Sequence, residues 1–171
     1  TAAILAGGKS SRMGEDKALL SIDGVALALR TANILRTCGL NHIYLVGRQA
    51  ELQTLGLPVI RDTHHNHHPL YGVAAALKAL PDSELLFLPC DLVNLERAHI
   101  ARLLDFGKPC VASSDGIKHP LLNIMPSHRA EQALQLAKLG APAHRLVSDL
   151  PVVTLPNPTL KDVNRPEQLT R

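Results

Sequence analysis

The sequence predicts an α/β fold, in which helices cover both faces of a mostly parallel β-sheet. The first observation is that apolar runs of strand length alternate along the chain with amphipathic segments of helix length. The second is that 171 residues, 46% of them hydrophobic and 19% charged, are enough for one full core. No repeat or linker divides the chain, so we expect residues 1–171 to form a single domain, a three-layer α/β/α sandwich.

Each expected strand is a short apolar run, and each expected helix places apolar residues three and four positions apart. The strands are expected at 2–6, 42–46, 59–61, 85–88, 110–112 and 152–155. The helices are expected at 27–38, 72–80, 96–104 and 129–139. Gly39 and Gly140 follow the first and last of these helices and are typical stop signals. Because ligands bind at the carboxyl ends of parallel strands, polar residues there are the first candidates for a site.

The most informative segment is 5–17, where the first strand runs into a loop rich in glycine and cations. Glycines let backbone N–H groups approach an anion, and Arg12 and Lys17 supply positive charge that a structural turn does not need. The spacing fits neither the P-loop nor the G-x-G-x-x-G fingerprint. The loop therefore predicts a different kind of nucleotide-phosphate site, the alternative being a glycine-rich surface loop.

Two further expected strands are followed by a carboxylate. Asp62 comes directly after the run 59–61, and Asp91 follows the run 85–88. Both should lie near the glycine loop, at one edge of the sheet. Mg²⁺ prefers one or two carboxylates together with substrate phosphate oxygens, so Asp91 is a candidate Mg²⁺ ligand. The alternative is that Asp91 caps a turn.

Histidines gather between the third expected strand and the second expected helix, at positions 64, 65, 67 and 68. They lack the fixed helical spacing of zinc sites, which favours a solvated segment or the rim of a substrate site over a metal site. Gly72 then lets the backbone approach a ligand closely, where a helix N-terminus adds partial positive charge. An ordinary loop-to-helix junction is the alternative for this segment.

Composition excludes several classes of protein. The chain has no Trp, two Tyr and two Phe, and its net charge of +3 is spread along the sequence, so we expect no nucleic-acid partner. Three cysteines without a C-x-x-C pair indicate neither a disulfide framework nor a zinc site, and they suit a reducing cytoplasm. No apolar run approaches the roughly 20 residues of a membrane span, and the chain does not open on a secretory signal. We therefore expect a cytoplasmic protein that does not bind membranes.

Taken in order, the motifs of the chain resemble those of the molybdenum cofactor guanylyltransferases. They are LAGG at 5–8, RMG at 12–14, DKALL at 16–20, PLYG at 69–72, PCD at 89–91, HP at 119–120 and DVNRPE at 162–167. The resemblance spans nearly the whole chain and implies a Rossmann-like fold of the nucleotide-diphospho-sugar-transferase type. It further implies transfer of GMP from GTP to Mo-molybdopterin with release of pyrophosphate, Mg²⁺ as cofactor, and a molybdoenzyme or a cofactor-insertion chaperone as recipient.

The same matching implies roles for individual residues. The positions matched to GTP binding are Leu5, Ala6, Gly7, Gly8, Lys17, Asp62, Gly72 and Asp91. The positions matched to catalysis are Arg12 and Lys17, which clamp the phosphates, and Asp91, which holds the metal. The positions matched to the pterin side are His119, Asp162 and Asn164.

Two departures bear on the nucleobase. Family members commonly carry Asn just after the second strand, where this chain has Val46-Gly47-Arg48. Asp162 stands where Asn is usual, as in the cytidylyltransferase relatives. Gly7 favours guanine, because those relatives usually carry Ala at that position. Three alternatives stay open: cytidylyl transfer to molybdopterin, nucleotidyl transfer to another small molecule, and a nucleotide-binding module without turnover.

Overall fold

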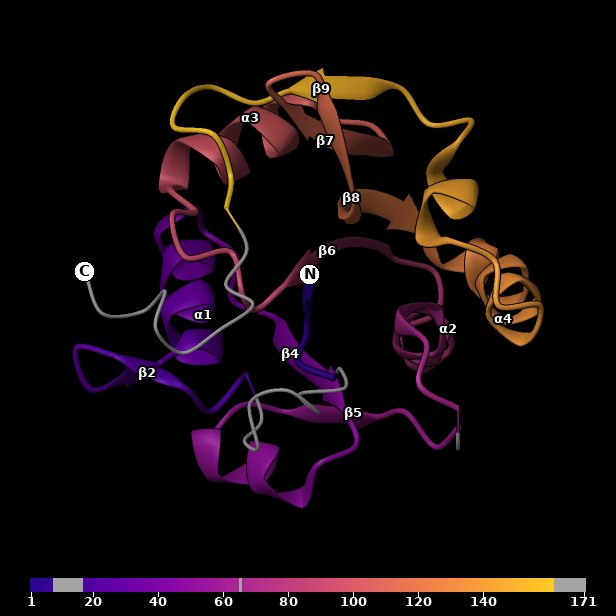
Figure 1. Ribbon diagram of the computed structural model, residues 1–171, viewed down its shortest axis with the longest axis horizontal. Coiled ribbons are helices and arrows are strands. Elements are labelled where there is room, and N and C mark those ends of the chain that lie inside the picture. The colour runs from indigo at the N-terminus through magenta and orange to yellow at the C-terminus, as the bar shows by residue number, and fades with distance from the viewer. Residues whose placement is uncertain (8–16, 65, 162–171) are drawn as a thin grey trace.

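The computed structural model describes residues 1–7, 17–64 and 66–161. Its main feature is a seven-stranded sheet (Figure 1). From one edge to the other, the strands are β5 (Val59–Arg61), β4 (Ile43–Gly47), β1 (Ala2–Leu5), β6 (Glu84–Pro89), β8 (Ile117–Pro126), β7 (Cys110–Ser114) and β9 (Val152–Thr154). Strands β5, β4, β1 and β6 run parallel, as do β7 and β9, whereas β8 is antiparallel to both of its neighbours. The expected, mostly parallel sheet is confirmed.

Helices cover both faces of the sheet. On one side lie α1 (Leu27–Thr37) and α3 (Arg97–Phe106), and on the other α2 (Pro69–Ala79) and α4 (Ala130–Lys138) (Figure 1). Short 3₁₀ helices occupy Ala50–Leu55, Ser127–Arg129 and Ala143–Val147, and a small hairpin pairs β2 (Ser21–Ile22) with β3 (Val25–Ala26). The three expected layers are therefore present.

Alternation along the central strands explains why two cores form. In β1, Ala2 and Ile4 belong to the buried cluster on the α1 and α3 side, whereas Ala3 and Leu5 belong to the cluster on the α2 and α4 side. Successive side chains of a strand point to opposite faces, so a strand covered on both faces must be apolar throughout. Fully burying each large side chain, such as Phe87 in β6, contributes about 1.5–3 kcal/mol.

Among the described residues β8 is the longest strand, and it is not one of the strands that the sequence predicts. Its stretch contains Pro120 and polar residues, so it shows no continuous apolar run. In its pairing with β7, Val111 faces Asn123 while Ala112 faces His119, which leaves residues 120–122 as a bulge. A bulge accommodates a proline inside a strand, because the extra residues make no ladder hydrogen bonds.

The start of α2 also differs from the expectation. The helix begins at Pro69 rather than at Gly72, and proline is favoured at the first helical position because its missing N–H would have no partner there. Gly72 therefore lies within the first turn of the helix, not in a loop before it.

Two further features concern the classes excluded above. Cys38, Cys90 and Cys110 form no disulfide with one another, and burial raises the pKa of the Cys110 thiol. Across the described ranges, no helix combines the length and the apolar content needed to cross a membrane.

Candidate active site

A cavity of about 360 Å³ opens at the carboxyl ends of β1, β4 and β6. This volume falls in the range of about 300–1,000 Å³ that is typical of small-ligand pockets. The described lining residues are Leu5, Ala6, Gly7, Lys17, Val46, Gly47, Arg48, Gln49, Asp62, His67, His68, Pro69, Gly72, Pro89, Cys90, Asp91 and Leu121. The three segments expected to converge, after β1, β5 and β6, therefore do meet at one edge of the sheet.

Lys17 and Asp91 form an ion pair on the wall of this cavity. Lys17 Nζ donates a hydrogen bond to Asp91 Oδ2 at 3.0 Å, and the two side chains are 23% and 19% exposed. The backbone around Lys17 is tied to the start of α1, because Leu20 N–H donates to the Lys17 carbonyl and Leu27 N–H donates to the Leu20 carbonyl. The pair thus joins the segment after the glycine loop to the carboxyl end of β6.

The ends of β1 and β4 approach each other closely beneath the cavity. A Cβ added to Gly7 would lie 3.5 Å from Gly47 Cα, an ordinary contact, whereas a Cβ on Gly47 would lie 2.6 Å from Leu52 Cδ1. Leu52 is fully buried, so it has little room to move aside. The sequence analysis overlooked Gly47, although a glycine that ends an apolar strand is itself a signal of close backbone approach.

Asp62 is held through both of its carboxylate oxygens and is 9% exposed. Oδ2 accepts hydrogen bonds from Arg48 Nε at 3.2 Å and from Arg48 Nη2 at 3.1 Å. Oδ1 accepts from the His64 backbone N–H at 3.0 Å and lies 3.2 Å from His64 Nδ1. Arg48 Nη2 also donates to the Asn66 carbonyl, so this arginine fastens the segment between β5 and α2 to the end of β4.

The pairing of Arg48 with Asp62 was not predicted from the sequence, because it follows from the register of β4 against β5. Gly47 and Arg61 are partners in the parallel pairing of β4 with β5, so the residues that follow them leave neighbouring strands side by side.

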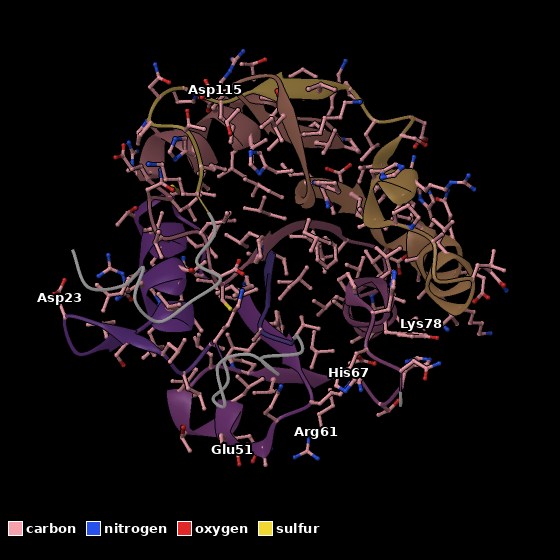
Figure 2. The ribbon with its side chains drawn as sticks, viewed as in Figure 1. Asp23, Glu51, Arg61, His67, Lys78 and Asp115 are labelled. Carbon is pink, nitrogen blue, oxygen red and sulfur yellow. The ribbon has the colours of Figure 1, made fainter. Side chains whose placement is uncertain are left out.

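The described histidines have other partners. His68 caps α2 by accepting a hydrogen bond from Leu70 N–H at 3.3 Å, and the His64 ring stacks on Tyr71 with centroids 4.3 Å apart. His67 and His68 line the cavity, as expected for a substrate rim, and Figure 2 shows His67 between β5 and the start of α2. Outside the undescribed positions, which include His65, no three His, Cys, Asp or Glu side chains form a group that could hold a metal ion.

Gly72 packs closely against the end of β4. A Cβ at this position would lie 3.3 Å from Val46 Cγ1, so glycine lets the first turn of α2 approach the end of β4. Gly72 also lines the cavity, and its close approach to a ligand stays a prediction.

The residues matched to the pterin side are only partly placed. His119 lies on β8, where its Nε2 is 2.6 Å from Ser114 Oγ, and it is not among the described residues that line the cavity. Leu121, in the bulge of β8, is the residue of this strand that reaches the lining. Gly8, Arg12, Asp162 and Asn164 lie outside the described residues.

With this geometry established, the chain can be compared with known proteins. Residues 2–153 match the family model of the MobA-like NTP transferase domain. The chain belongs to this family. Membership makes it a nucleotidyltransferase and confirms the resemblance that the motifs carry.

Relatives within the family are named molybdenum cofactor guanylyltransferases. The protein of Xanthomonas euvesicatoria pv. vesicatoria is 34% identical over 147 residues, which are 85% of this chain and 74% of that protein. The protein of Pseudomonas aeruginosa is 28% identical over 97% of this chain and 90% of its own length. A probable member from Carboxydothermus hydrogenoformans is 39% identical over 61% of this chain, and the match spans 52% of that protein.

Solved structures support the fold. Molybdopterin-guanine dinucleotide biosynthesis protein A from Archaeoglobus fulgidus superposes with a TM-score of 0.73 at 18% identity, covering 99% of this chain and 95% of that one. CTP:phosphocholine cytidylyltransferase from Streptococcus pneumoniae gives 0.66 at 15% identity, covering 100% and 96%. The architecture is therefore that of the nucleotide-diphospho-sugar-transferase type.

Proposed function

We propose that this chain is a molybdenum cofactor guanylyltransferase, which transfers GMP from GTP to Mo-molybdopterin, releases pyrophosphate and uses Mg²⁺. The observation that carries the proposal is the ion pair of Lys17 with Asp91, which places a cation and a carboxylate on the wall of a cavity at the carboxyl ends of β1, β4 and β6. The names of the family relatives supply the substrates. In this proposal residues 1–171 act as one domain, and the product passes to a molybdoenzyme or an insertion chaperone.

The proposed reaction is a displacement at phosphorus. An oxygen of the molybdopterin phosphate attacks the α-phosphorus of GTP, a new P–O bond forms, and the bond to the oxygen bridging the α- and β-phosphorus breaks. The electron pair of that bond leaves with pyrophosphate, so no covalent protein intermediate is needed. Lys17 and Arg12 hold the phosphates, and the ammonium of Lys17 stabilises the charge that spreads over them.

The donor set on this wall fits Mg²⁺. Asp91 offers a carboxylate at the carboxyl end of β6, and Mg²⁺ commonly takes one or two carboxylates and fills its remaining positions with water and substrate phosphate oxygens. A Mg²⁺ ion held there supplies further positive charge to the transferring phosphate. When GTP phosphates become the partner of Lys17, Asp91 Oδ2 is released from the ion pair and becomes available as a ligand.

The nucleoside is proposed to lie toward β4 and β5. There the wall is formed by Leu5–Gly7 at the carboxyl end of β1 and by the pair Arg48 and Asp62, and the first turn of α2 closes it. Because both oxygens of Asp62 are engaged by Arg48 and His64, its proposed role is to shape this wall. Gly7 supports guanine as the base, and His119, Asp162 and Asn164 remain proposed for the pterin side.

The test is an initial-rate assay of pyrophosphate release with Mg²⁺, Mo-molybdopterin and each of the four nucleoside triphosphates in turn. We expect release with GTP, dependent on the acceptor, and far slower release with the other three. Mixtures that lack the acceptor are the control for plain GTP hydrolysis. Preference for CTP would replace guanylyl by cytidylyl transfer, and magnesium-dependent GTP binding without pyrophosphate release would indicate a module without turnover.

A further inference from the structure

After β9 the chain returns across the α3 side of the sheet, through a segment that we name the C-terminal strap, residues 155–161. Figure 1 shows it in yellow, running from β9 past α3 toward the side on which α1 lies. Two of its side chains enter the core: Leu155 and Leu160 are each 6% exposed and belong to the same core cluster as Leu92. The strap is thus a packed part of the fold.

Asn94 binds the strap through both ends of its side-chain amide. Its Nδ2 donates to the Thr159 carbonyl, and its Oδ1 accepts from the Lys161 backbone N–H at 2.7 Å. Beside it, Val93 N–H donates to the Lys161 carbonyl at 3.3 Å. These bonds join the end of the strap to the segment that directly follows Asp91.

His99 fixes the beginning of the strap. The ring is fully buried, its Nδ1 accepts from the Glu96 backbone N–H at 2.9 Å, and its Nε2 lies 3.1 Å from the Pro156 carbonyl and 3.0 Å from the Pro158 carbonyl. Because Nδ1 accepts a hydrogen bond and Nε2 faces two carbonyl oxygens, the ring proton is on Nε2. His99 therefore anchors one end of the strap to α3, while Asn94 anchors the other end near Asp91.

The sheet opens beyond the end of β6, at the edge where the cavity lies. The pairing of β6 with β8 ends at Phe87 and Asn123, whereas β6 continues beside β1 up to Pro89. Leu121, from the bulge of β8, lines the cavity there. In the proposed function the nucleoside lies toward β4 and β5, so we expect the attacking phosphate to approach past the end of β6.

We propose that Asn94 is a positioning residue for the acceptor: it ties the strap to the segment after Asp91 and thereby sets the acceptor side of the cavity. This inference rests on the proposed function. Both side-chain hydrogen bonds of Asn94 go to the strap, and Asn94 lies on the β6 side of the fold. Removing the Asn94 side chain should therefore weaken binding of the acceptor and leave binding of GTP unchanged.

The experiment measures initial rates with GTP and Mo-molybdopterin varied separately, in the wild type and in Asn94→Ala. We expect the KM for the acceptor to rise about tenfold, as for the loss of one to two hydrogen bonds, and the KM for GTP to stay within about twofold. Asn94→Asp keeps an acceptor for the Lys161 N–H and loses the donor to Thr159, so its acceptor KM should lie between the two. This second variant also covers the case in which Asn94→Ala does not fold.

Thr159→Val is the matched control on the same strap. It removes the hydrogen bond from Thr159 Oγ1 to Asp115 Oδ2, at the tip of the β7–β8 hairpin where Figure 2 places Asp115, and it leaves the carbonyl for Asn94. Its acceptor KM should stay within about twofold of the wild type. Equal rises in both KM values, or an unchanged acceptor KM in the Asn94 variants, would overturn the inference alone. A wild type without guanylyl transfer would overturn the proposed function, and the inference with it.

Discussion

Two ion pairs stand on either side of β1 in the cavity, and their carboxylates are held in different ways. Within the described residues, Asp91 accepts its hydrogen bond from Lys17 through Oδ2 alone. Asp62 accepts through both oxygens, from the fork of Arg48 on one and from His64 on the other. The first carboxylate keeps lone pairs for a further cation, whereas the second has its lone pairs taken by protein donors.

The cations differ as well. A lysine ammonium is a compact charge on a flexible stem and can exchange one anionic partner for another, whereas an arginine fork holds a carboxylate in a fixed plane. Arg48 also binds the Asn66 carbonyl, so it fastens a loop as well as a side chain. The comparison teaches that the Lys17–Asp91 side is suited to chemistry on a changing ligand, and the Arg48–Asp62 side to holding a wall in place.

The largest expected effect comes from breaking the Lys17–Asp91 side. Lys17→Ala or Asp91→Asn should each lower kcat by about 10²–10³, the loss typical of one preorganised charged group that stabilises a transition state. Steady-state pyrophosphate release at saturating substrates measures it. Lys78→Ala and Asp23→Asn, at positions outside the cavity lining that are labelled in Figure 2, are the matched controls. Full activity in either cavity variant would remove that residue from the proposed mechanism.

Breaking the Arg48–Asp62 side should cost stability before it costs chemistry. In the wild type the Asp62 carboxylate is 9% exposed, and Arg48→Ala removes both donors to its Oδ2. We expect a loss of about 1–3 kcal/mol in the free energy of unfolding, together with a higher KM for GTP. Urea unfolding and initial rates measure the two effects.

Arg61→Ala is the control for that variant. Arg61 is the last residue of β5 and directly precedes Asp62, but its side chain points outward in Figure 2. It should change neither quantity. If Arg48→Ala lowered kcat as strongly as Lys17→Ala with no loss of stability, the division between the two sides would be wrong.

Sequence reasoning predicted the side of the cavity that uses local signals. The glycines after β1 and the carboxylate after β6 can be recognised from residue type alone, because each follows an apolar run of strand length. The parallel pairing of β1 with β6 puts the ends of the two strands at one edge of the sheet. The same rule located Asp62 but not its partner, because the pairing of Arg48 with Asp62 depends on the register of β4 against β5. Register is a tertiary property, set by which faces are buried.

The antiparallel half of the sheet was harder to predict. In β8 the bulge at 120–122 interrupts the alternation of apolar and polar residues, and the strand makes its ladders with β6 and β7, which lie on either side of it. The motif puts His119 on the pterin side, which stays a prediction, and the fold adds that its Nε2 lies 2.6 Å from Ser114 Oγ. Hydrogen bonds of this kind depend on strand pairing that no local pattern contains.

Gly7 tests whether the end of β1 selects the base. Gly7→Ala should fold normally, because the added Cβ would lie 3.5 Å from Gly47 Cα, and it should shift the ratio of kcat/KM for GTP to that for CTP by about tenfold toward CTP. Gly47→Ala is the packing counterpart: its Cβ would meet the buried Leu52, which should cost about 1–3 kcal/mol of stability. An unchanged GTP to CTP ratio in Gly7→Ala would remove the argument for guanine from this residue.

The smallest expected effect belongs to a third ion pair, remote from the cavity. Arg129 binds Asp149 through two hydrogen bonds, and this lowers the pKa of Asp149 below its ordinary value. The stabilisation is therefore complete above the ordinary carboxyl pKa and is lost as the pH falls through the lowered one. Because Asp149 is 60% exposed, solvent screening limits the contribution to about 0.2–1 kcal/mol. Urea unfolding should show Asp149→Asn to be less stable than the wild type at pH 7, and this difference in the free energy of unfolding should disappear in strong acid. Turnover at pH 7 should be unchanged. A difference that persists in acid would mean that the loss comes from packing and not from charge.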